Sequence, residues 1–356
     1  MRITIFTSVD GNYSIDRYAQ ELSESFPSNV EIKKLGLEKR PGLRGRILDK
    51  HLKYLRLARR EQGDWNIIVS ETYSFLLLAV EGSRSLVVCH DVHPLIENKK
   101  RGVLRSLLRG ELRRLIYVAA YRVNLRLMRR ARRIVTVSRH TREDLLRFCP
   151  FLSPDKVVAV HSGVSGNWAV IRDSTRLAEL RSARGLEGKK VILHVGNDSW
   201  YKNFQGLLRA FALLKGEDLV LVKAGDISRE NRWLIQELGI AGRVVHIQGA
   251  KPEELVALYN IAEMLAFPSL HEGFGWPPLE AMACGCPVLT TRRASLPEVC
   301  GDSCLCVEPE DIPEMAAAMS RLMNTPALRD ELVRKGFEQV KQFPWQKTAE
   351  GILSLL

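Results

Sequence analysis

The chain has 356 residues, 46% of them hydrophobic, so it can bury a core in each of two domains of ordinary size. No apolar run reaches the roughly 18 residues of a membrane-spanning helix, and the N-terminal MRITIFTSVDGN has a strand pattern rather than that of a signal peptide. The seven cysteines fit a reducing compartment. We therefore expect a cytoplasmic protein without a membrane span.

Positive charge is concentrated in the N-terminal half. Residues 1–165 hold 31 Lys and Arg against 17 Asp and Glu, whereas residues 166–356 hold 22 against 24. The basic half is expected to bind or lie beside something anionic. A nucleic-acid-binding protein is one alternative, but the basic segments lack interleaved aromatics and no such binding motif occurs, so we expect no nucleic acid partner.

Strands and helices alternate from the start of the chain. RITIFT predicts a buried strand, followed by a loop that contains Gly11, and WNIIVSETYSFLLLAV predicts a strand followed by an apolar helix. The buried strand SLVVC ends at His90. Because ligands bind at the carboxyl ends of strands in open α/β sheets, His90 is placed to contact a substrate.

Residues 99–133 hold 13 basic residues and one acidic residue. Their arginines recur at every fourth position, at Arg101, Arg105, Arg109 and Arg113. Ile116 and Val123 belong to the apolar side, so the segment predicts two amphipathic helices with a basic face. Such a face suits an anionic membrane surface or an acceptor with a lipid phosphate, and the alternative is a solvated surface over an ordinary core.

The second half opens with the strand VILHV, the turn GNDSWYKN and a helix. This turn contains Gly196, Asn197 and Lys202, and the lysine offers a point charge to a diphosphate. Gly249 ends a later strand, RVVHIQGA. Residues 166–188 have no strand pattern and are expected to form a linker and an entry helix.

The most informative stretch is AFPSLHEGFGWPPLEAMACGCPVLTT, residues 266–291. Pro277 and Pro278 suit the first turn of a helix, where a missing N–H costs nothing, so a helix is expected over residues 276–284. Gly285 is typical of a helix C-terminus, and a buried strand should follow it.

Two carboxylates lie in this stretch, Glu272 on the loop and Glu280 about one turn inside the helix. Gly273 and Gly275 let the loop backbone approach a ligand closely, while the helix N-terminus offers N–H groups to a phosphate. A carboxylate accepts two O–H bonds from a diol. A nucleotide-sugar, with a diphosphate and vicinal hydroxyls, would suit these groups.

The string EGFGWPPLEAMACGCPVL resembles the E-x7-E signature of the retaining family 4 glycosyltransferases, also called glycosyl transferases group 1. The resemblance implies an α/β GT-B fold, in which two Rossmann-like domains face each other across a cleft. It implies an N-terminal acceptor domain at 1–165, joined by a C-terminal helix at about 340–356. A donor domain would then occupy 166–339.

The resemblance also implies residue roles. Glu280 would bind the ribose, Glu272 and His90 would lie at the donor hexose, and Lys202 would bind the diphosphate, so that His90, Glu272 and Lys202 are the candidate catalytic residues. The residues implied in donor binding are Gly11, Gly196, Asn197, Lys202, Gly249, Glu272, Gly273, Phe274, Gly275 and Glu280. Many relatives carry an arginine before the lysine, whereas this chain has Tyr201.

The implied reaction moves a hexose, with mannose as the first candidate, from a nucleoside-diphosphate sugar to a glycan or lipid-linked hydroxyl with retention. No Asp-x-Asp motif is present, so we expect no metal and no cofactor. The resemblance also allows a cytoplasmic enzyme that lies peripherally on the inner face of the cell membrane.

Two other enzyme classes compete with this interpretation. A nucleotide-sugar 2-epimerase on the same scaffold would need acid–base carboxylates in the first domain, where Asp10 and Asp91 are the candidates. A glycoside hydrolase could use Glu272 and Glu280 but would leave Lys202 unexplained.

Five cysteines within 23 residues suggest a zinc site, although small buried side chains explain them better: Cys284, Cys286, Cys300, Cys304 and Cys306.

Overall fold

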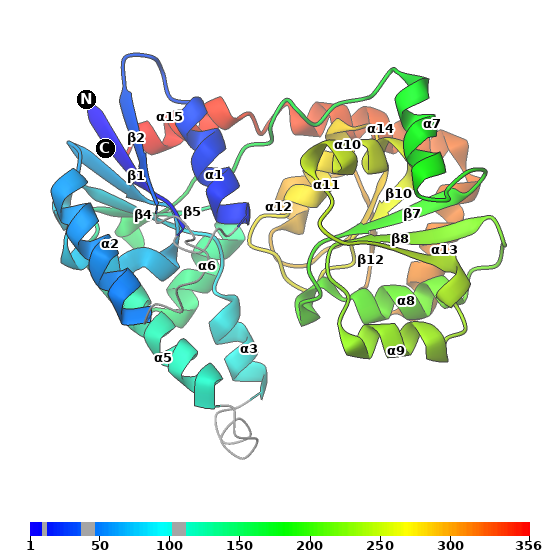
Figure 1. The fold of residues 1–356 in the computed structure, drawn as a ribbon, viewed down its shortest axis with the longest axis horizontal. Coiled ribbons are helices and arrows are strands. Elements are labelled where there is room, and N and C mark those ends of the chain that lie inside the picture. Colours follow the sequence, from blue (N-terminus) through cyan, green and yellow to red (C-terminus); the bar gives the residue numbers. More distant parts are fainter. Residues whose placement is uncertain (9–12, 37–46, 102–111) are drawn as a thin grey trace. The chain divides into compact units, whose positions relative to one another are not determined.

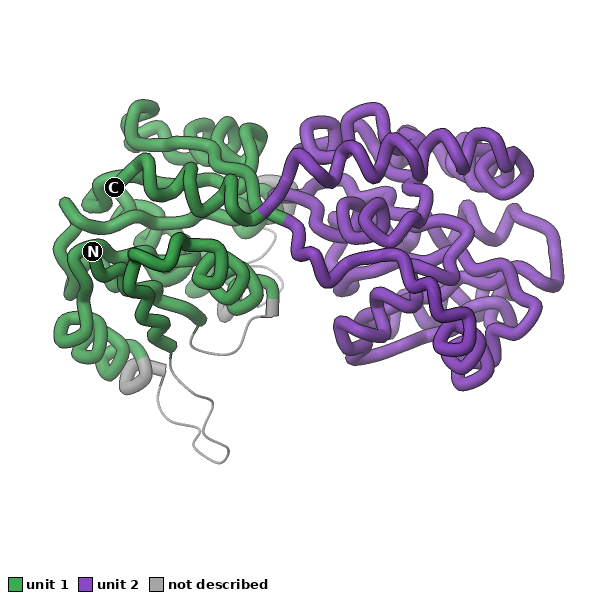
Figure 2. Tube along the Cα trace, turned by 90° about the horizontal axis from the view of Figure 1, so that it is seen from above, with its two compact units in different colours: residues 1–163, 345–356 green, residues 164–344 purple. Residues whose placement is uncertain are grey.

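The structure, a computed structural model, describes residues 1–8, 13–36, 47–101 and 112–356 (Figure 1). The chain divides into two compact units, coloured green and purple in Figure 2. Unit 1 comprises Met1–Gly163 and Trp345–Leu356, and unit 2 comprises Val164–Pro344. The sequence places these boundaries at 165 and at about 340.

Six parallel strands form the sheet of unit 1, in the order β2-β1-β3-β4-β5-β6. They are β1 (Arg2–Phe6), β2 (Glu31–Leu35), β3 (Trp65–Ile68), β4 (Ser85–Cys89), β5 (Arg133–Thr136) and β6 (Val157–Ala159). All five residues of β4 are buried, as expected when helices cover both faces of a parallel sheet.

The described α-helices of unit 1 are α1 (Tyr13–Glu24), α2 (Ile47–Glu61), α3 (His93–Arg101), α5 (Leu112–Leu127), α6 (Arg139–Phe148) and α15 (Trp345–Leu353). Ser138 caps α6, since its hydroxyl accepts a hydrogen bond from the N–H of Thr141 at 2.9 Å. The last helix returns to this unit, where the ring of Trp345 packs edge-on against Tyr18 at 5.2 Å.

In unit 1, one predicted helix is present but of another type, and one predicted helix face is wrong. The apolar segment after β3 is a 3-10 helix, η1 (Glu71–Leu78), and Phe75 in it packs against Tyr54. In α5, Ile116 and Val123 are exposed, and the residues that face the core are Val118, Tyr121 and Leu125. Tertiary contacts fix this rotation, because the Tyr121 hydroxyl donates to the Asp91 carbonyl at 3.0 Å and Asn124 accepts from the N–H of Phe75 at 2.8 Å.

Unit 2 contains a second parallel sheet, in the order β12-β11-β10-β7-β8-β9. Its strands are β7 (Lys190–Val195), β8 (Leu219–Ala224), β9 (Val244–Ile247), β10 (Ala262–Ala266), β11 (Val288–Thr291) and β12 (Leu305–Val307). Numbered from β7 as the first strand, this is the 3-2-1-4-5-6 order of dinucleotide-binding folds. The two sheets confirm the predicted α/β class with two doubly wound domains.

The α-helices of unit 2 are α7 (Ser174–Ala183), α8 (Phe204–Ala212), α9 (Arg229–Glu237), α10 (Pro252–Ile261), α11 (Trp276–Ala283), α12 (Leu296–Cys300), α13 (Ile312–Asn324) and α14 (Pro326–Val340). The predicted bounds of α11 are confirmed, with Pro277 and Pro278 in its first turn and Gly285 beyond its end at φ 72°. Among the described residues, no helix is long and apolar enough to cross a membrane.

Candidate active site

The strand order in unit 2 reverses direction between β7 and β10. The chain runs from β7 outward through β8 to β9, and then adds β10, β11 and β12 on the other side of β7. In open parallel sheets, ligands bind beyond the carboxyl ends of the strands at such a reversal. Lys202 follows β7 and Glu272 follows β10, so both side chains lie at this point.

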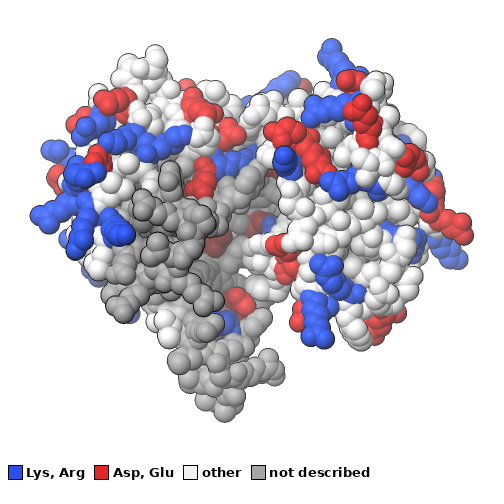
Figure 3. All heavy atoms as spheres, in the orientation of Figure 1, with Lys and Arg blue, Asp and Glu red and all other residues white. Residues whose placement is uncertain are grey.

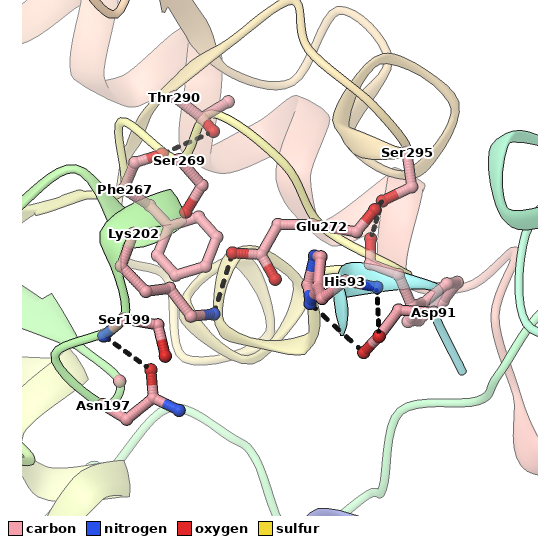
Figure 4. Close-up of polar contacts among 12 residues, drawn as sticks. Asp91, His93, Asn197, Ser199, Lys202, Phe267, Ser269, Glu272, Thr290 and Ser295 are labelled. Atoms are coloured by element: carbon pink, nitrogen blue, oxygen red, sulfur yellow. Dashed lines mark hydrogen bonds and ion pairs between the residues drawn. The ribbon is translucent and has the colours of Figure 1, made fainter. Parts of the chain in front are cut away.

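Lys202 and Glu272 form an ion pair, with 2.8 Å between Nζ and Oε1 (Figure 4). Both side chains are buried, and the ammonium group also lies 4.8 Å from the ring centroid of Phe267. Because an ammonium group has three N–H donors, Lys202 can keep this pair and still bind a phosphate oxygen.

The predicted glycine-rich loop connects β10 to α11. Gly275 has φ 101°, a conformation that residues with a side chain rarely adopt. The Ser295 hydroxyl lies 3.0 Å from the carbonyl of Glu272 and 2.8 Å from that of Phe274 (Figure 4). One serine from beyond β11 thus fixes the backbone on both sides of Gly273, next to the N-terminus of α11.

Glu280 is buried inside α11 and faces α10. The hydroxyl of Tyr259 donates a hydrogen bond to its Oε2 at 3.0 Å. Burial, and next the Glu280 charge, raise the pKa of Tyr259 well above its usual value, so this donor keeps its proton. The Trp168 ring packs edge-on against Tyr259 at 5.8 Å. The carboxylate is therefore held in one orientation.

The turn after β7 brings further predicted residues to the ion pair. Gly196 has φ 138°, and a Cβ placed on it would lie 3.4 Å from Cε of Lys202. Oδ1 of Asn197 accepts a hydrogen bond from the N–H of Ser199 at 3.2 Å (Figure 4). Gly249 follows β9, two strands from β7, so it lies farther along the same edge of the sheet.

In unit 1, His90 follows β4 as predicted. Its Nε2 lies 2.7 Å from the carbonyl of Val69 and must carry the proton, because a carbonyl only accepts. Burial lowers the pKa of His90, so the ring stays neutral and its Nδ1 is an acceptor. The ring packs edge-on against Tyr18 at 4.9 Å. The histidine is therefore both a packed residue and a possible hydroxyl acceptor.

Two carboxyl groups lie beside His90. Glu71, just after β3, accepts a hydrogen bond from the N–H of His90 at 3.2 Å. Burial, and next the Asp91 charge, raise the pKa of Glu71 to about 8. Burial works against ionisation of Asp91 too, but His93, with Nδ1 3.3 Å from Oδ2, lowers the pKa of Asp91 below its usual range. At neutral pH one carboxyl is therefore protonated and the other ionised.

Comparison with protein families agrees with this architecture. The family profile described as "Glycosyltransferase Family 4" matches residues 6–166, and the one described as "Glycosyl transferases group 1" matches residues 178–339. The chain carries two glycosyltransferase domains. Unit 1 contains the family 4 domain, and unit 2 contains the group 1 domain with the Lys202–Glu272 pair.

Named relatives resemble parts of this chain. The serotype-specific mannosyltransferase WbdA of Escherichia coli is 31% identical over 77% of this chain and 34% of its own length. The MMP alpha-(1->4)-mannosyltransferase of Mycolicibacterium hassiacum is 34% identical over 63% of this chain and 53% of its own length. The chain thus spans about a third of WbdA.

The fold also resembles solved structures over its whole length. Anabaena Alr3699/HepE, solved in complex with UDP and glucose, has a TM-score of 0.78 at 16% identity, covering 99% of this chain and 98% of that one. WaaG, a glycosyltransferase involved in lipopolysaccharide biosynthesis, has a TM-score of 0.74. This likeness in fold confirms the predicted GT-B architecture.

Some predicted residues of the family 4 domain cannot be placed. Gly11, Arg105 and Arg109 lie outside the described residues, and so do the side chains of Arg101 and Arg113 at the ends of α3 and α5. The prediction of a phosphate contact at Gly11 and of a basic face along 101–113 therefore stays a prediction.

Three residues beside the predicted ones were not predicted: Lys223 and Tyr259 in the group 1 domain and Glu71 in the family 4 domain. Lys223 has a recognisable signal, because it is the one charge in the otherwise apolar strand LVLVKA. Glu71 lies three residues after the end of β3 and could have been chosen by its position, as His90 was. Tyr259 has no such signal, since its contact with Glu280 joins two helices through tertiary packing.

The cysteines of the group 1 domain are explained by packing. Cys284, Cys286 and Cys300 are buried among apolar side chains. Cys304 and Cys306 alternate near the edge strand β12 with their sulfur atoms 3.5 Å apart. Burial among other causes raises the pKa of Cys284 to about 12, so this thiol stays protonated. The three buried positions fit small hydrophobic residues, as predicted, whereas Cys304 and Cys306 are half-buried.

Proposed function

We propose that the chain transfers a hexose, with mannose as the first candidate, from a nucleoside-diphosphate sugar to a hydroxyl of a glycan or lipid-linked acceptor. The observation that carries the proposal is the Lys202–Glu272 pair at the strand reversal, beside the N-terminus of α11. The UDP and glucose found with HepE support a nucleotide-sugar as donor. The names of WbdA and the Mycolicibacterium relative support mannose.

The residues of the group 1 domain take complementary roles. The ammonium group of Lys202 and the N–H groups at the start of α11 stabilise the negative charge that develops on the leaving diphosphate. Glu280, oriented by Tyr259, accepts hydrogen bonds from the ribose diol, and Glu272 accepts them from the hexose. From the family 4 domain, His90 offers its Nδ1 to a donor hydroxyl.

We further propose that transfer proceeds with retention and without a metal ion. Lys202 and the helix N-terminus supply the positive charge that a metal would otherwise supply, and the sequence has no Asp-x-Asp motif. An alpha linkage formed from an alpha-linked donor is a retained configuration, which agrees with the name of the Mycolicibacterium relative. The donor phosphate oxygen would take the proton of the attacking hydroxyl.

Calorimetric titration with UDP, GDP and ADP, followed by their sugar derivatives, tests the proposal. We expect one nucleotide to bind and the others to bind at least tenfold more weakly. Glu280→Gln should weaken binding of that nucleotide and leave binding of inorganic diphosphate unchanged.

Two further measurements test retention and metal independence. Proton NMR of the product should show a retained anomeric configuration, and EDTA should not reduce turnover. Wild-type protein that binds none of the three nucleotides would exclude the proposed donor site.

A nucleotide-sugar 2-epimerase is the second candidate, and one observation favours it. Glu71 and Asp91 form a protonated and an ionised carboxyl pair at neighbouring strand ends of the family 4 domain, as acid–base chemistry on a sugar would need. Incubation of the bound nucleotide-sugar without an acceptor separates the two functions. An epimerase converts the donor alone, whereas a transferase needs the acceptor.

We also propose that the family 4 domain acts at an anionic membrane surface. Three large apolar residues of α5 are exposed, Ile116 by 60%, Tyr117 by 54% and Val123 by 53%, and Arg122 and Arg126 lie on the same helix. Figure 3 shows further Lys and Arg side chains gathered at the left edge of unit 1. Exposed apolar residues among arginines suit the boundary between headgroups and acyl chains.

Co-sedimentation with phosphatidylglycerol vesicles at low salt tests this surface. Arg105, Arg109 and Arg113 changed together to Glu should abolish sedimentation, and so should Arg122→Glu with Arg126→Glu. The matched control is Arg229→Glu with Arg232→Glu, two exposed positions on α9 of the group 1 domain. Wild-type protein that stays in the supernatant would exclude the membrane surface.

A further inference from the structure

A second lysine of the group 1 domain lies beneath the turn that precedes Lys202. Lys223 lies near the end of β8, between β7 and β9, with 0% of its surface exposed. In the register of the parallel strands its neighbours are His194 on β7 and His246 on β9. An ammonium group is costly to bury, so its surroundings must compensate for the lost water.

The partners of Lys223 are backbone carbonyls. Its Nζ donates a hydrogen bond to the carbonyl of Gly196 and lies 3.5 Å from that of Asn197. The ammonium group also lies 5.1 Å from the ring centroid of Phe204. Within the described part of the chain it forms no ion pair with a carboxylate at 4 Å or less. The main polar contacts of the lysine are therefore with two consecutive backbone carbonyls of the turn.

Other contacts fix the same turn from the neighbouring strand. The N–H of Gly196 donates to the carbonyl of Ala224 at 3.0 Å. A Cβ placed on Gly225 would lie 2.0 Å from the carbonyl oxygen of Gly196, so this close approach requires glycine. Asp198 is bound as well, since its Oδ1 accepts from the side-chain amide of Asn231 at 2.6 Å.

The position of these carbonyls determines the direction of the next N–H groups. In a trans peptide the C=O and N–H bonds point in opposite directions. With the carbonyls of Gly196 and Asn197 turned toward Lys223, the N–H groups of Asn197 and Asp198 point away from the buried lysine. Neither N–H forms a hydrogen bond within the described residues. Successive N–H groups in such a turn form an anion-binding concavity.

We propose that Lys223 is a positioning residue for the leaving diphosphate: it orients the Gly196–Asn197 turn so that two backbone N–H groups bind a phosphate oxygen beside Lys202. The inference rests on the proposed function, because it needs a nucleoside diphosphate at this edge of the sheet. A Cβ on Gly196 would lie 3.8 Å from Nζ of Lys202, so the turn and that ammonium group are adjacent. Many relatives have an arginine before Lys202, where this chain has Tyr201. The turn thereby supplies hydrogen-bond donors that Tyr201 does not.

Protonation of Lys223 should control this arrangement. Burial lowers the pKa of Lys223 to about 8; the nearby charge of Lys202 adds to the shift, while Asp198 and Asp226 oppose it. Burial, and next the Lys223 charge, hold the pKa of His194 well below its usual value, so that ring stays neutral. Above about pH 8 the neutral amine donates more weakly, and affinity for the diphosphate should fall.

The test is calorimetry with the tightest-binding nucleoside diphosphate and with the matching nucleoside, at several pH values from 6.5 to 9.5. Lys223→Met removes the charge, Lys223→Arg keeps it at every pH, and Lys215→Met is the exposed control on the same domain. We expect about 10- to 100-fold weaker diphosphate binding in Lys223→Met, with nucleoside binding unchanged. Wild-type affinity should fall as the pH rises through about 8, and Lys223→Arg should remove that fall.

The possible outcomes separate the two proposals. Wild-type protein that binds no nucleoside diphosphate would overturn the proposed function and this inference with it. Wild-type binding that is independent of pH, or equal diphosphate binding by a folded Lys223→Met, would overturn the inference alone. If Lys223→Met does not fold, the wild-type pH profile still decides. A thermal melt of each variant establishes that it is folded.

Discussion

The two domains place different ionisable groups at the carboxyl edges of similar parallel sheets. In the family 4 domain the residues that follow the strands include the carboxyl groups of Glu71 and Asp91. In the group 1 domain two ammonium groups, Lys202 after β7 and Lys223 near the end of β8, join the carboxylate of Glu272 after β10. The overall charges of the two halves of the chain follow the opposite pattern, because the N-terminal half is net positive and the C-terminal half is slightly net negative. Residues 1–165 hold 31 basic and 17 acidic residues, and residues 166–356 hold 22 and 24.

This contrast separates surface charge from binding chemistry. Formal charge describes what the surface of a domain attracts over a distance of about a Debye length, and exposed side chains dominate it. The groups at the strand ends are few and buried, so each interacts strongly with a bound ligand. Ammonium groups suit a diphosphate, and carboxyl groups suit the hydroxyls of a sugar. Each prediction below changes one of these groups.

The largest effect is expected at Lys202. Lys202→Met should lower the rate of transfer by about 100- to 1000-fold, or about 3–4 kcal/mol, because it removes a preorganised charge from the leaving diphosphate. Steady-state kinetics with saturating donor measure this loss. The exposed Lys215→Met should retain wild-type turnover. Near wild-type turnover in Lys202→Met would show that the ion pair with Glu272 serves only the fold.

A smaller effect is expected at Glu71 and appears as pH-dependent stability. Its pKa is raised in the fold, so between about pH 4.5 and 8 the native state binds a proton that the unfolded state has released. The stabilising contribution is complete below that window and is lost as the pH rises through it. Asp91 has a lowered pKa and is ionised in both the native and the unfolded state over this pH range, so it does not change the free energy of unfolding with pH there.

Glu71→Gln keeps the shape of the side chain and removes its ionisation. The wild-type free energy of unfolding should therefore fall by an amount on the order of 2 kcal/mol between pH 5 and pH 8, whereas that of the variant should change less. Urea unfolding at each pH measures both. The matched control is the exposed Glu81→Gln, which should follow the wild type. If the free energy of unfolding changed equally with pH in the wild type, Glu71→Gln and Glu81→Gln, Glu71 would be ionised in the fold.

The smallest effect is expected at Tyr259, which orients Glu280. Tyr259→Phe removes one hydrogen bond to a charged group and should weaken nucleotide binding about 5- to 10-fold, or about 1 kcal/mol. Calorimetry with the nucleoside measures the ribose contact apart from the phosphates. Tyr117→Phe, on the exposed face of α5, is the control. An unchanged nucleoside affinity in Tyr259→Phe would place the ribose elsewhere.

Much of the local structure could be predicted from the sequence. The bounds of α11 followed from two prolines and a glycine, and the buried strands followed from apolar runs, because these signals act within a few residues. Distant contacts decide the rest. The helix predicted after β3 is present but is a 3-10 helix, and the prediction for α5 was wrong, because a different face of that helix packs on the core.

The sequence by itself determined which chemical groups this protein has at the ends of its strands, since a residue such as Lys202 lies beyond a strand that its neighbours encode. Only the tertiary structure decided which of those groups meet. Lys202 and Glu272 are 70 residues apart and come within 2.8 Å because β7 and β10 are adjacent in the sheet. Strand order depends on contacts across the whole domain, and no local pattern of residues encodes it.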